Sequence, residues 1–347
     1  MFRGALITCL IVALTGCAGA SADLSPVLED RVTCEKPRPG PPLEIRYLGS
    51  GGHLIRRGAS AIMTAPFFSN PGLFRVGMGR ISPDSARIDA AVEKIIENGG
   101  RLDDVQAILV GHAHYDHLMD VPRVWREYAP RATIFGSLTA KHILRGFDVP
   151  DDRIETLNAG AASRWAAGRW VSLDGVRFMA IESEHAPHAF GIKLYGGEVR
   201  EDLERPPRWA TEYREGQTFA FLIDFTDPDG SVAFRIHYQD SASNAPLGYP
   251  PTLDGDDQRS VDVAIVCAAS FSQVRGYPEG ILRAVDPRYV VMGHWEDFFI
   301  SQEEPPRPVP MTDVAEFVTR TERALPERAR WVLPEPHAVL RIEQCAH

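Results

Sequence analysis

The chain has 347 residues, of which 44% are hydrophobic and 24% charged, and its formal net charge is −10. This length allows one large domain or two ordinary ones, with a sizeable core. The acidic balance argues against nucleic acid as the main partner, since that binding depends on Lys and Arg. A phosphate-containing substrate is compatible with this balance, because a bound metal can supply local positive charge.

The first 17 residues are predicted to be a targeting segment. Arg3 provides a positively charged N-terminal region, residues 4–14 are almost wholly apolar, and small residues surround Cys17. The run Leu14-Thr15-Gly16-Cys17 resembles the bacterial lipobox, in which cleavage leaves the cysteine to carry a lipid. An ordinary secretory signal is the alternative. In either case we expect export, and with a lipid the protein would be anchored to a bacterial membrane on the periplasmic side.

Residues 18–42 are small, polar and proline-rich, which predicts a flexible linker before a folded domain at 43–347. Cys267 lies in an apolar run and is expected to be a buried thiol. Cys34 and Cys345 lie near the two ends of the mature chain. We treat a disulfide between them as a hypothesis, because domain termini are often close and the exported compartment is oxidising.

In chain order, the first half of the domain is predicted to contain strands and two helices. Residues 43–48 alternate as a half-buried strand, and after a glycine-rich turn residues 53–63 are predicted to return as another strand. Helical spacing covers 88–96 and stops at Asn98-Gly99-Gly100. Further elements are predicted in chain order: a strand at 107–110, a helix at 118–128 and a strand at 132–135.

The second half is predicted to begin with two hairpins. One joins 170–173 to 176–181 through Asp174-Gly175, and the other joins 218–225 to 232–237. Between them, the charged stretch 196–217 indicates a surface insertion, either a lid or a solvated loop. The last predicted elements are strands at 261–267, 289–292 and 339–342, and helices at 278–285 and 312–325, with Thr312 as the cap of the latter. Two strand-rich runs, each followed by helices, predict two sheets with helices outside.

The densest chemical signal is the run His112-Ala113-His114-Tyr115-Asp116-His117, directly after an apolar stretch. A continuous helix would scatter these side chains around its circumference, whereas a strand entering a tight loop could turn them towards one point. Histidine and aspartate together suit zinc, iron or manganese better than magnesium or calcium. Surface histidines in a polar loop are the less favoured interpretation, so the run is predicted to be a metal site.

Three further residues each follow an apolar strand: His185, Asp240 and His294. Any one alone would more often be a structural polar residue, but together they predict a converging site. His188 is an alternative to His185, which we favour because it lies nearer the strand end. His53 has no partner motif and is expected to be structural.

The run from His112 to His117, followed by a His, an Asp and a His after successive strands, resembles the metallo-β-lactamase superfamily over about residues 43–343. The run at 47–52 is similar to the first hairpin of that family. The run at 293–298 is similar to the branch with ascorbate-phosphate lactonases and N-acylphosphatidylethanolamine phospholipase D. The resemblance implies an α/β fold, a four-layer αβ/βα sandwich with two metal ions along one edge.

The resemblance also implies the ligand set by position. The first metal would be held by His112, His114 and His185, the second by Asp116, His117 and His294, and Asp240 would bridge them. The two divalent ions are expected to be zinc, with manganese or iron as alternatives. That family usually has an Asp-Pro pair where this chain has Ala65-Pro66. The missing carboxylate normally supports a ligand, so metal affinity or rigidity could differ.

Together these residues predict a metal-dependent hydrolase that cleaves an ester, lactone or phosphodiester. A metal-bridging hydroxide, formed because metal binding lowers the pKa of water to about 7, would attack. Asp116 would orient this nucleophile and act as general acid and base. The substrate is expected to be a small or lipid-like molecule. The alternative is a catalytically weak or inactive metal-binding protein with the same fold, and a diiron redox protein is disfavoured because no flavin-binding motif is found.

Overall fold

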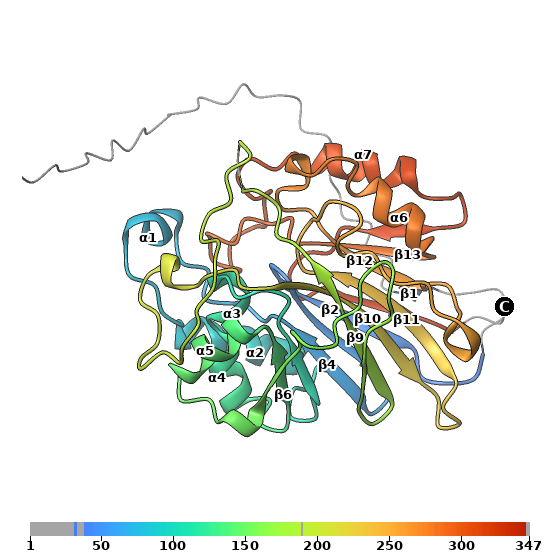
Figure 1. Ribbon diagram of the computed structural model, residues 1–347, viewed down its shortest axis with the longest axis horizontal. Helices are drawn as coiled ribbons and strands as arrows, with labels where there is room; N and C mark the ends of the chain where they lie inside the picture. Colours follow the sequence, from blue (N-terminus) through green and yellow to red (C-terminus); the bar gives the residue numbers. More distant parts are fainter. Residues whose placement is uncertain (1–30, 33–37, 189, 345–347) are drawn as a thin grey trace, which may run out of the picture.

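The computed structural model describes residues 31–32, 38–188 and 190–344. In these residues two mixed β-sheets pack face to face, and helices cover their outer faces (Figure 1). This is the four-layer αβ/βα sandwich that the sequence predicts. The predicted targeting segment and both members of the hypothetical Cys34–Cys345 pair lie outside the described residues. No described helix is long and apolar enough to cross a membrane.

The first sheet combines an antiparallel half with a parallel half. Its strand order is β1 (Arg31–Val32), β15 (Val339–Ile342), β2 (Leu43–Gly49), β3 (Gly52–Arg57), β4 (Ser60–Thr64), β5 (Ala107–Leu109), β6 (Thr133–Gly136) and β7 (Ile154–Thr156). The single strand predicted at 53–63 is wrong, because Gly58 adopts φ +58° and turns the chain between β3 and β4. Strand β1 pairs with β15 from within the stretch predicted to be a linker.

The second sheet contains both predicted hairpins. Its strand order is β14 (Arg330–Val332), β13 (Tyr289–Gly293), β12 (Val263–Cys267), β11 (Val232–Gln239), β10 (Thr218–Thr226), β9 (Val176–Ser183) and β8 (Trp170–Ser172). Strands β8 and β9 pair across Asp174-Gly175, where Gly175 adopts φ +67°, a conformation that favours glycine. Strands β9, β11, β12 and β13 run in one direction and therefore end at one edge.

Helices close the two outer faces and bury one side each. The first sheet is covered by α2 (Ser85–Glu97), α4 (Val121–Glu127) and α5 (Leu138–Arg145), the second by α6 (Glu279–Val285) and α7 (Val314–Ala324). In α2 the buried residues follow helical spacing, whereas Ile96 is exposed. The predicted cap Thr312 is wrong, since Asp313 accepts the hydrogen bond from the backbone N–H of Glu316. The short helix α1 (Leu73–Met78) buries only Val76.

The predicted helix at 118–128 is divided into two. One helical turn, α3 (Tyr115–Leu118), lies inside the metal motif, and α4 begins at Val121. Pro122 lies in the first turn of α4, where the missing N–H of proline removes no helical hydrogen bond. In the interior of one continuous helix over 118–128, the same proline would break the helix. The tight loop expected through His117 therefore ends at His114, and Asp116 and His117 share one helical turn.

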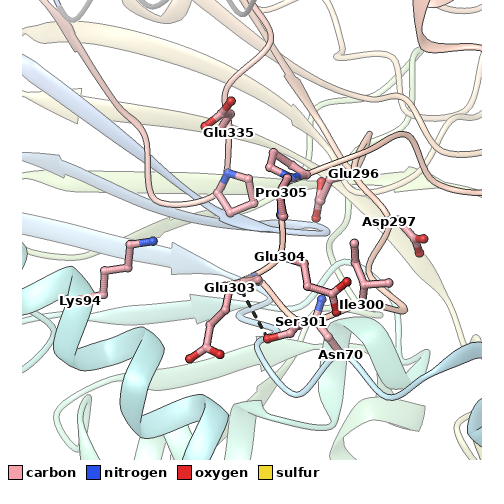
Figure 2. A pocket seen from close by; sticks show the side chains of 13 residues that line it. Asn70, Lys94, Glu296, Asp297, Ile300, Ser301, Glu303, Glu304, Pro305 and Glu335 are labelled. Carbon is pink, nitrogen blue, oxygen red and sulfur yellow. Dashed lines mark hydrogen bonds between the residues drawn. The ribbon is translucent and has the colours of Figure 1, made fainter.

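A surface cavity of about 270 Å³ lies beside the loop that follows β13 (Figure 2). Five carboxylates line it, those of Glu296, Asp297, Glu303, Glu304 and Glu335. Among the described residues, every group of three or more side chains that could hold a metal ion lies elsewhere. None of the seven predicted ligands, all of which are described residues, lines this cavity.

Candidate metal centre

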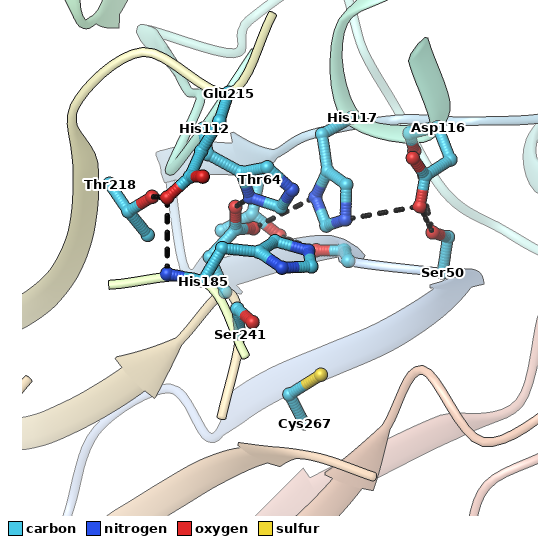
Figure 3. Close-up of polar contacts among 12 residues, drawn as sticks. Ser50, Thr64, His112, Asp116, His117, His185, Glu215, Thr218, Ser241 and Cys267 are labelled. Atoms are coloured by element: carbon cyan, nitrogen blue, oxygen red, sulfur yellow. Dashed lines mark hydrogen bonds and ion pairs between the residues drawn. The ribbon is translucent and has the colours of Figure 1, made fainter. Parts of the chain in front are cut away.

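The seven predicted ligands come together at the edge where β5, β9, β11 and β13 end. His112 and His114 follow β5, Asp116 and His117 lie on α3, and the other three follow β9, β11 and β13: His185, Asp240 and His294. Figure 3 shows His112, His117 and His185 close together, with Asp116 beside Ser50. All seven are buried except His185, which is partly buried.

The first group is a triangle of imidazoles from His112, His114 and His185. Their ring centroids are 4.6–4.7 Å apart. The Nε2 atoms of His112 and His114 are buried, and no described residue forms a hydrogen bond with them. Leaving a buried polar atom unpaired normally costs about 1–3 kcal/mol. Nitrogen lone pairs that converge in this way fit a metal ion that would use them as ligands.

The second group is a tighter triangle. The Oδ2 atom of Asp116 lies 3.3 Å from His117 Nε2 and 3.2 Å from His294 Nε2, and the two nitrogens are 3.2 Å apart. Ligand bonds of about 2.0–2.1 Å around tetrahedral zinc place neighbouring ligand atoms about 3.3 Å apart. These three atoms therefore fit three corners of a zinc tetrahedron.

Asp240 lies between the two groups. Its Oδ2 atom is 2.5 Å from Nδ1 of His112, and its Oδ1 atom is 3.0 Å from Nδ1 of His117. The hydroxyl of Tyr238 donates a hydrogen bond to Oδ1 at 2.5 Å. A Cβ atom at Gly111 would come within 2.3 Å of the Cβ of Asp240, so this approach requires glycine. One carboxylate thus contacts both halves of the site.

His185 and His188 stack on each other and differ in which ring nitrogen carries the proton. The Nδ1 atom of His185 is 2.5 Å from the carbonyl oxygen of Ala186, which can only accept, so Nδ1 is protonated and Nε2 keeps its lone pair. The Nδ1 atom of His188 instead accepts from the backbone N–H of Leu194 at 3.1 Å. Its proton is therefore on Nε2. This difference favours His185 as the ligand.

The two groups also differ in charge. Burial, the largest cause, lowers the pKa of His112, His114 and His185, which favours the neutral imidazoles that bind metals. Burial would also lower the pKa of His117, but the carboxylates of Asp240 and Asp116 raise it to about 10. The second group therefore holds a proton that a metal ion would displace.

Glu215 supports the first group and was not singled out from the sequence. Its Oε1 atom accepts from the backbone N–H of His185 at 3.3 Å and is 3.1 Å from Nζ of Lys193. The surface insertion predicted at 196–217 is thus only partly correct, because Ala210, Tyr213 and Glu215 are buried. No local motif marks Glu215, since its partners are fixed only by the fold.

A second network holds His294. The hydroxyl of Tyr47 donates to Glu296 and accepts from the backbone N–H of His294 at 2.8 Å. The other oxygen of Glu296 accepts from the backbone N–H of Ser50 at 2.5 Å. His294 adopts φ +55°, which a non-glycine residue rarely does, so the surrounding contacts have to hold it there.

Asp120 takes part in shaping the loop after β4, where the resembling family usually has an aspartate and this chain has Ala65. Ala65 is buried and offers no carboxylate. Asp120 accepts from the backbone N–H groups of Phe68 and Ser69, each at 2.7 Å, and from the Ser69 hydroxyl at 2.6 Å. Burial raises the pKa of Asp120 to about 6. The carboxylate of Asp120, which lies between α3 and α4, therefore fixes this loop.

His53 and Cys267 are both buried and belong to none of the potential metal groups among the described residues. The Nδ1 atom of His53 lies 3.3 Å from the carbonyl oxygen of Gly51. Cys267 is a buried free thiol whose pKa is raised by burial. Both observations agree with the expectations from the sequence.

Comparison with solved structures identifies the fold. The metallo hydrolase Igni18 from Ignicoccus hospitalis matches at 14% identity and a TM-score of 0.50, covering 87% of this chain and 99% of that chain. The metallo-β-lactamase fold protein YhfI from Bacillus subtilis matches at 10% identity, covering 86% and 99%, with a TM-score of 0.47. No family model and no curated protein matches the sequence. The chain therefore shares the fold of that metallo hydrolase, a four-layer αβ/βα sandwich.

Proposed function

We propose that the protein is a hydrolase that uses two divalent metal ions, with zinc the best match to the donor set. The observation that carries this proposal is the pair of convergent triangles, each with ligand atoms within 4.8 Å of one another. The first ion would be held by His112, His114 and His185, and the second by Asp116, His117 and His294. Asp240 contacts both groups and would serve both ions. The unpaired Nε2 atoms of the first group and the tetrahedral spacing of the second support this assignment.

When bound, two such ions supply a water nucleophile that ionises near neutral pH and Lewis acidity towards the substrate oxygen. The protein side chains then have separate tasks. Asp116 is ionised, because His117 and His294 lower its pKa well below the ordinary value although burial alone would raise it. It can orient the attacking water and accept its proton. The Tyr47 hydroxyl fixes the backbone of His294.

The bond cleaved is proposed to be an ester, a lactone or a phosphodiester. Paired metal ions held by these residues would suit such reactions, because they would supply Lewis acidity both to the attacked group and to the leaving oxygen. We also propose export and lipid attachment at Cys17, from the apolar residues 4–14 and the lipobox-like run at 14–17. Attachment to a membrane would bring the protein close to lipid-like substrates, which we therefore include.

Metal analysis combined with a substrate panel tests the proposal. The protein would be loaded with zinc or manganese and assayed on p-nitrophenyl esters, lactones and bis(p-nitrophenyl) phosphate. We expect two ions per chain and hydrolysis of at least one class. Asp116→Ala should lose about 100-fold or more in kcat, because a positioned acid or base typically contributes about 100- to 10,000-fold. The exposed Asp103→Ala is the matched control.

The alternative function is a metal-binding protein with weak catalysis or none. The observation that favours it is Ala65, where the resembling family usually has a carboxylate. Two bound ions without hydrolysis across the panel would favour this alternative. A protein that stays free of metal after loading would contradict both.

A further inference from the structure

We propose that His188 is a neutral hydrogen-bond donor whose Nε2–H binds an oxygen atom of the substrate next to the first metal group. This inference rests on the proposed hydrolase function and adds a residue to it. A donor held near the reacting atoms stabilises negative charge that develops on a substrate oxygen. His188 would thus contact the substrate, whereas His185 would contact the metal.

The protonation state of His188 follows from one hydrogen bond. The backbone N–H of Leu194 donates to Nδ1 of His188 at 3.1 Å. Only an unprotonated nitrogen can accept, so the ring is neutral and its single N–H is on Nε2. A neutral ring with this arrangement has no second lone pair to offer a metal ion. His188 therefore presents a donor, and not a ligand, at its outer nitrogen.

Both the ring and the backbone of His188 are held in place. It stacks on His185 with the ring centroids 4.7 Å apart and the planes 20° apart. Its backbone N–H donates to the carbonyl oxygen of Ile192 at 2.9 Å, and the Ser270 hydroxyl donates to its carbonyl oxygen at 3.4 Å. Because these contacts exist before any substrate binds, ordering the His188 side chain on substrate binding should cost little entropy.

The position of His188 is beside the metal centre and not within it. Its ring centroid is 5.5 Å from that of His114 and 6.2 Å from that of Tyr195. The residue is only partly buried. Among the described residues, none forms a hydrogen bond with its Nε2 atom. This N–H is therefore available to a ligand that enters beside the first group.

Three substitutions at His188 separate a donor role from a stacking role. His188→Phe keeps a ring on His185 and removes the donor. In His188→Gln the side-chain amide can reach the place of Nε2, whereas in His188→Asn it reaches only the place of Nδ1. His185→Gln is the comparison, because it removes a proposed ligand. Circular dichroism would confirm that each variant folds.

With bis(p-nitrophenyl) phosphate as substrate, His188→Phe and His188→Asn should lose roughly 10- to 100-fold in kcat/KM, at or below the loss seen for one oxyanion donor. His188→Gln should recover most of this loss. All three should still bind two metal ions, whereas His185→Gln should bind fewer. Loss of a metal ion in His188→Phe, or equal activity in Phe and Gln, would overturn the proposal.

Two further measurements do not depend on turnover. In the zinc-loaded protein, nitrogen-15 spectra should show a directly bonded proton on Nε2 of His188 and none on Nδ1. Inorganic phosphate, measured by calorimetry, should bind about five-fold more weakly to His188→Phe than to the wild type, as expected for one lost hydrogen bond. A proton on Nδ1, or unchanged phosphate binding, would refute the donor role. If the wild type hydrolyses nothing, only the proposed function fails and these measurements still decide the role of His188.

Discussion

The buried hydroxyl of Tyr47 gives a prediction that connects stability with metal binding. It donates to Glu296 and accepts from the backbone N–H of His294 at 2.8 Å, and the Tyr47 side chain is 1% exposed. Tyr47→Phe removes one oxygen atom and leaves the ring in place. Two buried groups, the carboxylate oxygen of Glu296 and the N–H of His294, would then lose their partner.

The expected loss of stability can be worked out from these two groups. Each buried polar group left unpaired costs about 1–3 kcal/mol, so the free energy of unfolding should fall by roughly 2–6 kcal/mol. His294 is also at φ +55°, and losing one of its supports should weaken metal binding by the second group about 10- to 100-fold. Urea unfolding of the metal-free protein and competition of the zinc-loaded protein with a chelator measure the two effects.

Tyr128→Phe is the matched control. The Tyr128 hydroxyl donates to Asp89 at 2.6 Å in a half-exposed position away from the metal centre. Its removal should cost less than about 1 kcal/mol, because water can replace the lost partner. It should leave zinc affinity unchanged. If Tyr47→Phe unfolds like the control and keeps the wild-type zinc affinity, the role assigned to this network is incorrect.

Three other predictions concern pH, charge and space. Burial lowers the pKa of His237 from 6.5 to about 4, so about 3 kcal/mol of stability should be present above pH 6.5 and be lost as the pH falls to 4. His237→Gln, which keeps a donor for Gly248, should flatten urea-unfolding stability over this range, and an unchanged slope would contradict this. Arg235→Leu should lower the free energy of unfolding by about 1–3 kcal/mol, because Asp224 would lose its buried partner at 2.7 Å and keep only the partly exposed Arg177 at 2.9 Å. An unchanged free energy of unfolding in urea would refute it. Gly111→Ala should displace Asp240 and reduce bound zinc, whereas Gly77→Ala should not, because no described atom lies within 4 Å of the added Cβ. Equal zinc content in both variants would count against the site.

The hairpins and the set of clustered residues could be predicted because their signals are local. Asp174-Gly175 specifies its own turn, and the run from His112 to His117 needs no distant partner to be recognised. His185, Asp240 and His294 were found because each follows an apolar strand, and strands that run in one direction end at one edge. Their role as ligands stays a prediction.

The supporting contacts could not be predicted in the same way. Tyr47 and Glu296 are separated by 249 positions, and neither residue carries a motif that names the other. Glu215 lies in a charged stretch whose composition predicts exposure to solvent, but the fold buries it in contact with the backbone N–H of His185. The helix expected at 118–128 failed because Pro122 set a new start, and α5 was missed although Ser137 caps it. Local patterns thus indicated the candidate ligands, and only the fold showed which contacts support them.

The central claim is that this chain holds two metal ions in two separate groups of side chains. Mass spectrometry of the metal content of the wild type, His185→Ala and His294→Ala tests it directly. The two variants each remove one ligand from a different group. We predict two ions per chain in the wild type and about one in each variant. A wild-type protein that holds no metal after loading with zinc and manganese would contradict the claim.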